Sequence, residues 1–65
     1  MYPNLRAEIA RKGMTVSELG QKIGMARTTI YDKYSGRTDF TLAEAVAVRT
    51  ALNVDIPLDE LFSKA

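Results

Sequence analysis

The sequence predicts a compact, all-α domain of five short helices. Two observations point to this fold class. In every segment between residues 4 and 62, apolar residues recur three or four positions apart, and no segment alternates apolar and polar residues as a strand would. The segments are also separated by short connections that carry residues typical of helix starts and helix ends. The 65 residues suffice for one domain, over residues 1–65, with one hydrophobic core.

The first helix is expected over residues 4–12. Leu5 and Ile9 lie one helical turn apart and therefore share a face. Gly13 follows, in a position where glycine commonly ends a helix because it tolerates a positive φ. Pro3 is compatible with a first helical turn, so the helix can begin a residue earlier.

The second helix is expected to begin after Thr15. Thr15-Val16-Ser17-Glu18 is a capping box, in which the Thr15 hydroxyl and the Glu18 carboxylate each bond a backbone N–H group that has no partner within the helix. Leu19 and Ile23 extend the apolar stripe. Gly24 then permits the positive φ that ends the helix in a tight turn.

The third helix is expected over residues 26–35, before Gly36. Ile30 and Tyr34 lie one turn apart and are expected to face inward. The outward stripe of this helix consists almost entirely of polar or amphipathic side chains, namely Arg27, Thr28, Tyr31, Asp32 and Ser35. Because a turn of only about three to four residues around Gly24 joins the second and third helices, their spacing fits a helix-turn-helix.

A second capping box, Thr41-Leu42-Ala43-Glu44, opens the longest helix. One face of this helix is expected to be apolar and buried, with Leu42, Ala45, Val48 and Leu52. Asn53 can adopt the left-handed conformation that ends the helix. Pro57 then precedes a final short helix, whose apolar side carries Leu58, Leu61 and Phe62.

From Thr15 to Phe62 the chain resembles the phage Cro and repressor type of helix-turn-helix domain, a lambda-repressor-like DNA-binding fold that is also common among bacterial prophage regulators. The shared positions are Thr15, Glu18, Leu19, Ile23-Gly24, Ile30, Ser35-Gly36, Phe40-Thr41-Leu42, Leu52 and Leu58-Asp59-Glu60-Leu61. This combination is far more specific than any of its members. The resemblance implies a transcriptional regulator that binds double-stranded DNA, with the helix at residues 26–35, the recognition helix, in the major groove.

Three positions depart from the pattern of that family. Gly20 stands where the family usually has Ala, which weakens the second helix by ~1 kcal/mol and still allows the third helix to approach closely. Ala26 replaces the usual Ser or Thr cap of the recognition helix. Lys33 occupies a place that is often apolar. None of the three removes the outward stripe of the recognition helix.

The resemblance assigns base reading to the exposed side of the recognition helix. Arg27 and Thr28 match the principal base-reading positions, with Tyr31 beside them and Asp32 one turn further on. Arginine can bind guanine O6 and N7 together, a carboxylate can accept from the amino group of cytosine, and Thr or Tyr can contact the thymine methyl group. The alternatives are a solvated helix face without function and, for Asp32, an ion pair with Arg27 or Lys33.

Phosphate contacts are expected from helix starts and from polar side chains that flank the recognition helix. Helix starts present backbone N–H groups to an anion, and cations add affinity that does not depend on base sequence. The expected phosphate-contacting residues are Thr15, Val16, Lys33, Ser35, Arg37 and Thr41. Cap formation alone would also account for the two threonines, and exposure for solubility would account for Arg37.

Charge is unevenly distributed along the chain, although the formal net charge is only +1. Residues 1–37 carry seven Lys or Arg and three Asp or Glu, whereas residues 38–65 carry two and five. This difference suits a basic face toward DNA and an acidic rear. Arg49 interrupts the apolar stripe of the fourth helix and is expected to form a structural ion pair with Glu18 or Glu44.

Composition excludes several function classes. The chain contains no Cys and no His, which removes disulfides, the usual zinc sites and the commonest general base. No enzymatic activity, cofactor, metal or small-molecule ligand is therefore expected. No apolar run approaches the ~20 residues that cross a bilayer, and the first residues lack a signal-peptide pattern, so a cytoplasmic location is expected. The competing function is a protein-interaction module of the same fold, antitoxin-like or adaptor.

The expected assembly is a symmetric homodimer on a palindromic operator. One recognition helix reaches only a few base pairs, so useful specificity needs two half-sites about 34 Å apart. The expected dimer surface follows Asn53, where the apolar area exceeds what one small core is expected to absorb, and consists of Ile56, Leu58, Leu61 and Phe62. Because this surface is small, the free protein is expected to be largely monomeric and to pair on DNA.

Overall fold

In the computed structural model, which describes residues 2–64, the chain forms α-helices and, within that range, no strand. The helices are α1 (Pro3–Arg11), α2 (Val16–Lys22), α3 (Arg27–Ser35), α4 (Leu42–Leu52) and α5 (Leu58–Leu61). The all-α class and the order of the five helices are as predicted. The boundaries differ from expectation only at the helix ends, where assignments commonly vary by a residue or two.

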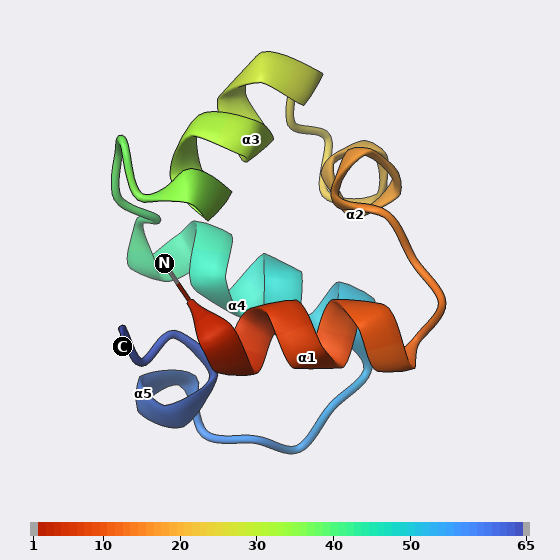
Figure 1. The fold of residues 1–65 in the computed structure, drawn as a ribbon, viewed down its shortest axis with the longest axis vertical. Helices are drawn as coiled ribbons and strands as arrows, with labels where there is room; N and C mark the ends of the chain where they lie inside the picture. Colours follow the sequence, from red (N-terminus) through yellow and green to blue (C-terminus); the bar gives the residue numbers. More distant parts are fainter. Residues whose placement is uncertain (1, 65) are drawn as a thin grey trace.

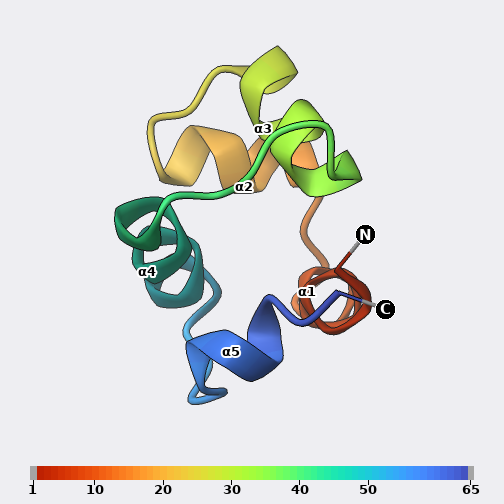
Figure 2. The same ribbon diagram turned by 90° about the vertical axis from the view of Figure 1, so that its left-hand side faces the viewer.

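The five helices enclose one core. Figure 1 shows α2 and α3 at one end of the domain, α1 and α4 across its middle and α5 at the other end. In the perpendicular view, α1 and α4 lie on opposite sides, with α2 and α3 above them and α5 below (Figure 2). α2 packs against α3 and α4, while α5 packs against α4 and α1. α3 is therefore held by its neighbours on one side and leaves its other side at the surface.

The buried apolar side chains come from every helix and from the residue before α1. They are Tyr2, Leu5, Ile9, Leu19, Ile30, Ala45, Val48, Leu52 and Leu61. Each was expected on an inward apolar stripe except Tyr2, which extends the stripe of α1 by one turn, and Leu61, which was expected at a surface between two copies of the chain. Burial of an aliphatic or aromatic side chain stabilises a fold by roughly 1.5–3 kcal/mol, so these residues supply most of the favourable free energy of folding.

Leu42 is the exception on the apolar face of α4. Its side chain is 73% exposed, so the expectation that it is buried was wrong. Leu42 is the first residue of the helix and lies on the rim of a groove that Ala45, Leu58 and Phe62 also line. The buried stripe begins one turn later, at Ala45, because no other element covers the first turn of α4 on this side.

Local sequence signals end and begin the helices as expected. The hydroxyl groups of Thr15 and Thr41 each accept a hydrogen bond from the backbone N–H three residues later, at 3.1 Å. The carboxylates of Glu18 and Glu44 each accept a hydrogen bond from the backbone N–H of that threonine, at 2.8 Å. Both predicted capping boxes are therefore complete. Asn53 adopts the left-handed conformation at φ 54°, which ends α4.

An aromatic cluster joins the two ends of the described chain to the loop between α3 and α4. The rings of Tyr2, Phe40 and Phe62 meet edge to face, with centroids 5.6 Å apart for Tyr2–Phe40, 5.7 Å for Tyr2–Phe62 and 5.0 Å for Phe40–Phe62. Such pairs add about 0.5–1.5 kcal/mol beyond the area they bury. The Asn4 side-chain amide also donates to the Glu60 carbonyl at 2.8 Å. The loop that follows the recognition helix is thus anchored to the residues that precede α1 and follow α5.

Candidate nucleic-acid interface

A tight turn joins α2 to α3. Gly24 adopts the predicted positive φ, at 72°, and the Met25 N–H donates to the Gly20 carbonyl at 2.8 Å. A Cβ atom on Gly20 would lie 2.9 Å from Cγ2 of Ile30 and 3.1 Å from the Met25 carbonyl oxygen, closer than such atoms normally approach. The predicted close approach of α3 to α2 at Gly20 is therefore confirmed, and it fixes the position of α3 on the domain.

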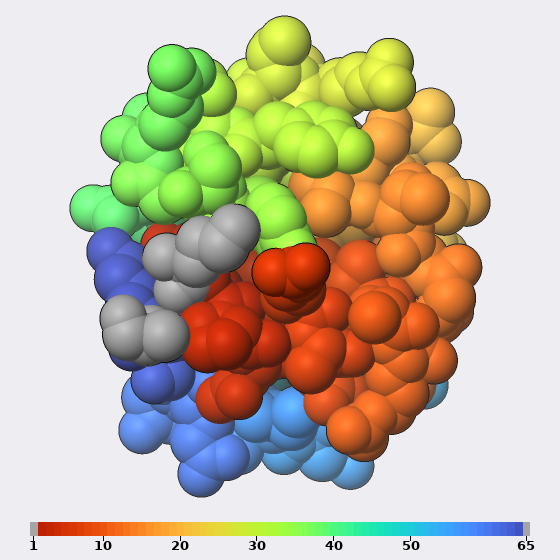
Figure 3. All heavy atoms as spheres, in the orientation of Figure 1, coloured from red at the N-terminus to blue at the C-terminus, as the bar shows by residue number. Residues whose placement is uncertain are grey.

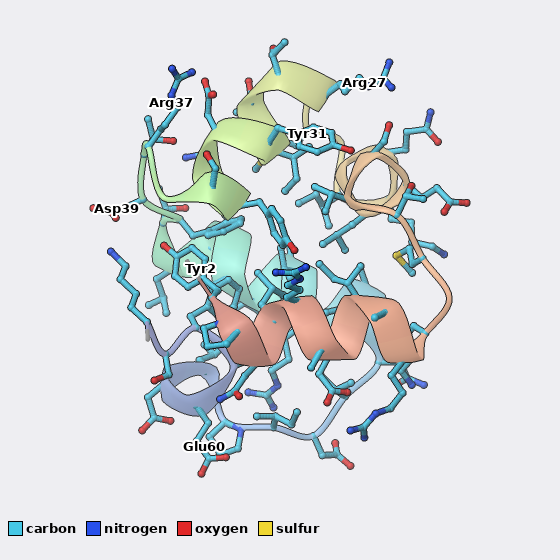
Figure 4. The ribbon with its side chains drawn as sticks, viewed as in Figure 1. Tyr2, Arg27, Tyr31, Arg37, Asp39 and Glu60 are labelled. Carbon is cyan, nitrogen blue, oxygen red and sulfur yellow. The ribbon has the colours of Figure 1, made fainter. Side chains whose placement is uncertain are left out.

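α3 has one buried face and one exposed face. Ile30 is fully buried and Tyr34 packs against the core, as expected. The exposed residues of the helix are Arg27, Thr28, Thr29, Tyr31 and Ser35. Figure 4 shows Arg27 projecting from the first turn of α3 and Tyr31 following one turn later. In the space-filling view, α3 forms the upper edge of the molecule, where a flat or grooved partner can reach it (Figure 3).

Asp32 pairs with Arg37, in the loop after α3, and not with Arg27 or Lys33. The guanidinium of Arg37 lies 3.4 Å from the Asp32 carboxylate, and both side chains are substantially exposed. The turn after α3 brings them together, because the Arg37 N–H donates to the Asp32 carbonyl at 2.9 Å. The expected partner of Asp32 was wrong, since sequence spacing within the helix could not show where the loop returns.

Lys33 is largely shielded from solvent by neighbouring residues. Its Nζ atom lies 3.0 Å from Oε1 of Glu44 and donates to the Asp39 carbonyl at 2.9 Å, and its side chain is only 13% exposed. This placement contradicts the free ammonium that the expected phosphate contact requires. It also corrects the expectation for Arg49, which forms no ion pair within residues 2–64, whereas Glu44 is taken by Lys33.

The starts of α2 and α4 are capped in the same way. The backbone N–H of Thr15 holds the pKa of Glu18 below its ordinary value, and the backbone N–H of Thr41 does the same for Glu44, with a further lowering by the Lys33 ammonium. Thr15 and Thr41 are exposed, and Val16 is half-buried. Beyond the capped groups, the first turn of each helix keeps backbone N–H groups without an intrahelical acceptor.

The charges around α3 are of mixed sign. Arg37 is matched by Asp32 and Lys33 by Glu44, whereas Arg27 takes part in no ion pair among the residues that the structure describes. The cations of α3 and of the loop after it therefore do not form a continuous basic patch. Arg27 is the cation of α3 that is most available to an anionic partner.

The C-terminal surface differs from the expected dimer face. Leu61 is fully buried, and Ile56 and Phe62 are half-buried against the core, so one domain absorbs most of the apolar area that was expected to remain. Leu61 cannot lie between two copies of this fold, and its assignment to the dimer surface was wrong. The exposed large apolar side chains are instead Tyr31, Leu42 and Val46.

Glu44 and Asp39 are site residues that sequence reasoning missed. Asp39, in the loop between α3 and α4, and Glu44, in the first turn of α4, both bind Lys33, and no short-range pattern indicates these contacts. Asp39 also accepts a hydrogen bond from Lys64 through its carboxylate, at 3.2 Å. In contrast, the burial of Tyr2 was accessible from the sequence, because Tyr2, Leu5 and Ile9 share one helical stripe.

Comparison with protein families identifies the domain. Residues 4–63 match the Cro/C1-type HTH DNA-binding domain, a family of DNA-binding domains and not of enzymes. No significant match was found among curated proteins or solved structures. Among residues 2–64, no helix has both the length and the apolar composition that crossing a membrane requires. The family match covers nearly all of the chain, includes both helices of the helix-turn-helix and agrees with the five-helix fold. The chain therefore belongs to the Cro/C1-type helix-turn-helix family of DNA-binding domains.

Proposed function

We propose that this domain is a transcriptional regulator of the phage or prophage Cro and repressor type, which reads a specific operator with α3 in the major groove. The observation that carries the proposal is the division of α3 into two faces. Ile30 is fully buried beside Gly20, while Arg27 and its polar neighbours are exposed. A helix anchored on its inner face presents a fixed set of donors and acceptors to base edges, which sequence-specific reading requires.

The base-reading residues are Arg27, Thr28, Tyr31 and Asp32. Arg27 lies in the first turn of α3, the part of a recognition helix that enters the groove most deeply, and its guanidinium suits guanine O6 and N7. Thr28 and Tyr31 suit the thymine methyl group, and Asp32 suits the amino group of cytosine. Arg37 supports this last role, because it offsets the repulsion between the Asp32 carboxylate and DNA phosphates.

The phosphate-contacting residues are those that remain exposed or lie at helix starts. They are Thr15, Val16, Ser35, Arg37 and Thr41. Backbone N–H groups in the first turns of α2 and α4 add to these side chains. Such contacts fix the orientation of the domain on the duplex and supply affinity that is independent of base sequence.

The same proposal includes a homodimer that forms on a palindromic operator. The domain measures 25 × 22 × 20 Å along its principal axes, and half-sites lie about 34 Å apart. Because the half-site separation exceeds the longest dimension of the domain, two copies can share only a small contact area, and pairing depends on DNA. The apolar candidates for this edge are Leu42, Ile56, Leu58 and Phe62, of which Leu42 is by far the most exposed.

The test is selection of bound sites from a random pool of double-stranded DNA. The expected result is an enriched sequence with a two-fold repeat and an affinity that falls steeply with salt, by about 0.9 in log K per phosphate contact for each unit of log salt. The matched control is the variant Arg27→Ala/Thr28→Ala, which is expected to enrich nothing beyond random sequence. If the wild-type domain enriched no sequence and its affinity for DNA did not depend on salt concentration, binding to a specific operator would be excluded.

A protein-interaction module of the same fold is the second candidate function. The mixed charges around α3 favour it, because Lys33 and Arg37 are already matched by acids of the same domain. An antitoxin-like or adaptor protein would present this face to another protein. The selection experiment separates the two functions, since an interaction module without DNA binding yields no enriched sequence.

A further inference from the structure

Lys33 connects three segments around the recognition helix. It lies in the second half of α3, its Nζ atom donates to the Asp39 carbonyl at 2.9 Å in the following loop, and the same atom lies 3.0 Å from Oε1 of Glu44 in the first turn of α4. The side chain of Lys33 is 13% exposed and that of Glu44 is 28% exposed. A pair this well shielded from water is weakened by salt far less than a surface ion pair.

Glu44 has two roles at once. The Oε1 atom that faces Lys33 also accepts the hydrogen bond from the Thr41 backbone N–H at 2.8 Å. One carboxylate oxygen therefore caps α4 and binds α3. Glu18 provides a natural comparison within the same domain, because it caps α2 at Thr15 with the same 2.8 Å bond but forms no ion pair within residues 2–64.

We propose that Lys33 is a positioning residue for DNA recognition that acts through Glu44 and does not itself contact DNA. The inference rests on the proposed operator binding. The ion pair fixes α3 relative to the start of α4, so that the base-reading side chains of α3 and the phosphate-facing start of α4 meet the duplex in one fixed geometry. Removing the pair leaves each element in place on its own but loosens their relative orientation.

The positioning role and charge alone predict opposite effects of Glu44→Gln on DNA affinity. Glu44→Gln removes a negative charge close to the DNA, which by charge alone strengthens binding. Glutamine still completes a capping box, so the cap of α4 is kept and the partner of Lys33 is weakened. We expect Glu44→Gln to weaken binding to the operator by about 3- to 30-fold. Glu18→Gln is the matched control and is expected to leave affinity unchanged or slightly increased.

Lys33→Met separates positioning from a phosphate contact. Methionine keeps a long, unbranched apolar stem in this shielded place and removes the charge. Under positioning, operator affinity falls by about 3- to 30-fold while the slope of log K against log salt is unchanged. If Lys33 contacted a phosphate, that negative slope would become less steep by about 0.9, and affinity for random DNA would fall by the same factor as affinity for the operator.

The decisive measurement is the ratio of operator to random-DNA affinity for wild type, Lys33→Met, Glu44→Gln and the double variant, at a temperature where circular dichroism shows all four folded. We expect the ratio to fall in both single variants and to fall little further in the double variant, because one interaction is lost in each case. Should Lys33→Met fail to fold, Glu44→Gln against Glu18→Gln carries the test. Tighter binding by Glu44→Gln, or a reduced salt slope in Lys33→Met, overturns the positioning role. Absence of operator binding by the wild type would instead refute the proposed function.

Discussion

The Arg37 guanidinium lies 3.4 Å from the carboxylate of Asp32, so the loop after the recognition helix neutralises the one acid on the exposed side of that helix. Both side chains are largely exposed, at 77% for Arg37 and 45% for Asp32. An exposed pair of this kind contributes little to stability, with typical values of about 0.2–1 kcal/mol. Its importance is in the charge that α3 presents to DNA.

Arg37→Ala is expected to weaken binding to all DNA sequences alike. The variant loses one cation near the phosphates and leaves Asp32 without its partner. The negative slope of log K against log salt therefore becomes less steep by about 0.9. Fluorescence anisotropy on operator and random duplexes over a salt series measures both quantities. In the control Asp32→Asn/Arg37→Ala, part of the loss on random duplexes is recovered, because the unpaired carboxylate no longer repels the phosphates. A loss confined to the operator would show that Arg37 reads bases.

Arg27→Ala is expected to cost ~1–3 kcal/mol of binding free energy on the operator and to relax preference at one base position. The reason is that Arg27 projects from the first turn of α3 with no ion pair to any described residue. Competition binding against operators changed at single positions provides the measurement. Thr29→Ala, at an exposed position of the same helix that is not assigned to base reading, is the control and retains preference at every position. Equal losses on operator and random DNA would remove Arg27 from the base-reading set.

Gly20→Ala is expected to lower the free energy of unfolding by up to about 2 kcal/mol. Alanine gains about 1 kcal/mol in helix propensity, but overpacking a core costs about 1–3 kcal/mol, and the new Cβ atom would lie 2.9 Å from Cγ2 of Ile30. Chemical denaturation measures the change. Gln21→Ala, exposed on the same helix, is expected to be nearly neutral. Replacing Ile30 by Leu in the Gly20→Ala background removes that Cγ2 atom and recovers part of the loss.

The two capping boxes predict how stability depends on pH. The pKa values of Glu18 and Glu44 are both lowered from the ordinary value of 4.5, chiefly by the backbone N–H groups of Thr15 and Thr41. A carboxyl group whose pKa is lowered on folding stabilises the folded state at pH values above its pKa in the unfolded chain. This stabilisation is lost as the pH falls through the pKa of the folded state. Thermal unfolding between pH 7 and pH 3 should therefore show Tm falling below about pH 4.5. The variant Glu18→Gln/Glu44→Gln should show a shallower fall, and an identical one would exclude the capping carboxylates as its cause.

Leu42→Ser is expected to reduce cooperative occupation of a palindromic operator by about tenfold and to leave binding to a single half-site unchanged. Leu42 is 73% exposed, so the substitution does not disturb the core, whereas Phe62 belongs to the aromatic cluster and its replacement would destabilise the domain. Gel-shift titration of one-site and two-site duplexes measures cooperativity. Val46→Ser, exposed one turn later on α4, is the control. Unchanged cooperativity in Leu42→Ser would place the contact between copies elsewhere.

The features that sequence predicted correctly depend on neighbours in the chain. The capping boxes at Thr15 and Thr41 are interactions over three residues, and the positive φ values at Gly24 and Asn53 reflect the conformational preferences of single residues. The exposure of the polar side of α3 likewise follows from helical periodicity once Ile30 is assigned inward. Each of these was accessible because the cause lies within one turn of the residue concerned.

The features that sequence missed depend on where the chain returns in space. Lys33 was expected to be free because its partners, Asp39 and Glu44, belong to the next loop and the next helix. Leu61 was expected at a surface because its contacts come from other helices, and Leu42 was expected in the core because the absence of a covering element is not visible in periodicity. Charge and hydrophobicity along the sequence indicate which residues form ion pairs or pack in a core, but not which residues they contact.

The aromatic cluster has a consequence for how the domain forms during protein synthesis. Helical domains usually fold fast because most of their contacts are local. Here, Phe40 packs against both Tyr2 and Phe62, so the loop that follows the recognition helix acquires its final neighbours only after Phe62 has left the ribosome. In a nascent chain arrested before Phe62, the loop after α3 would therefore lack its contact with Phe62. DNA binding would arise in one step once Phe62 has emerged, which arrested chains of increasing length would reveal as a single gain of affinity at that length.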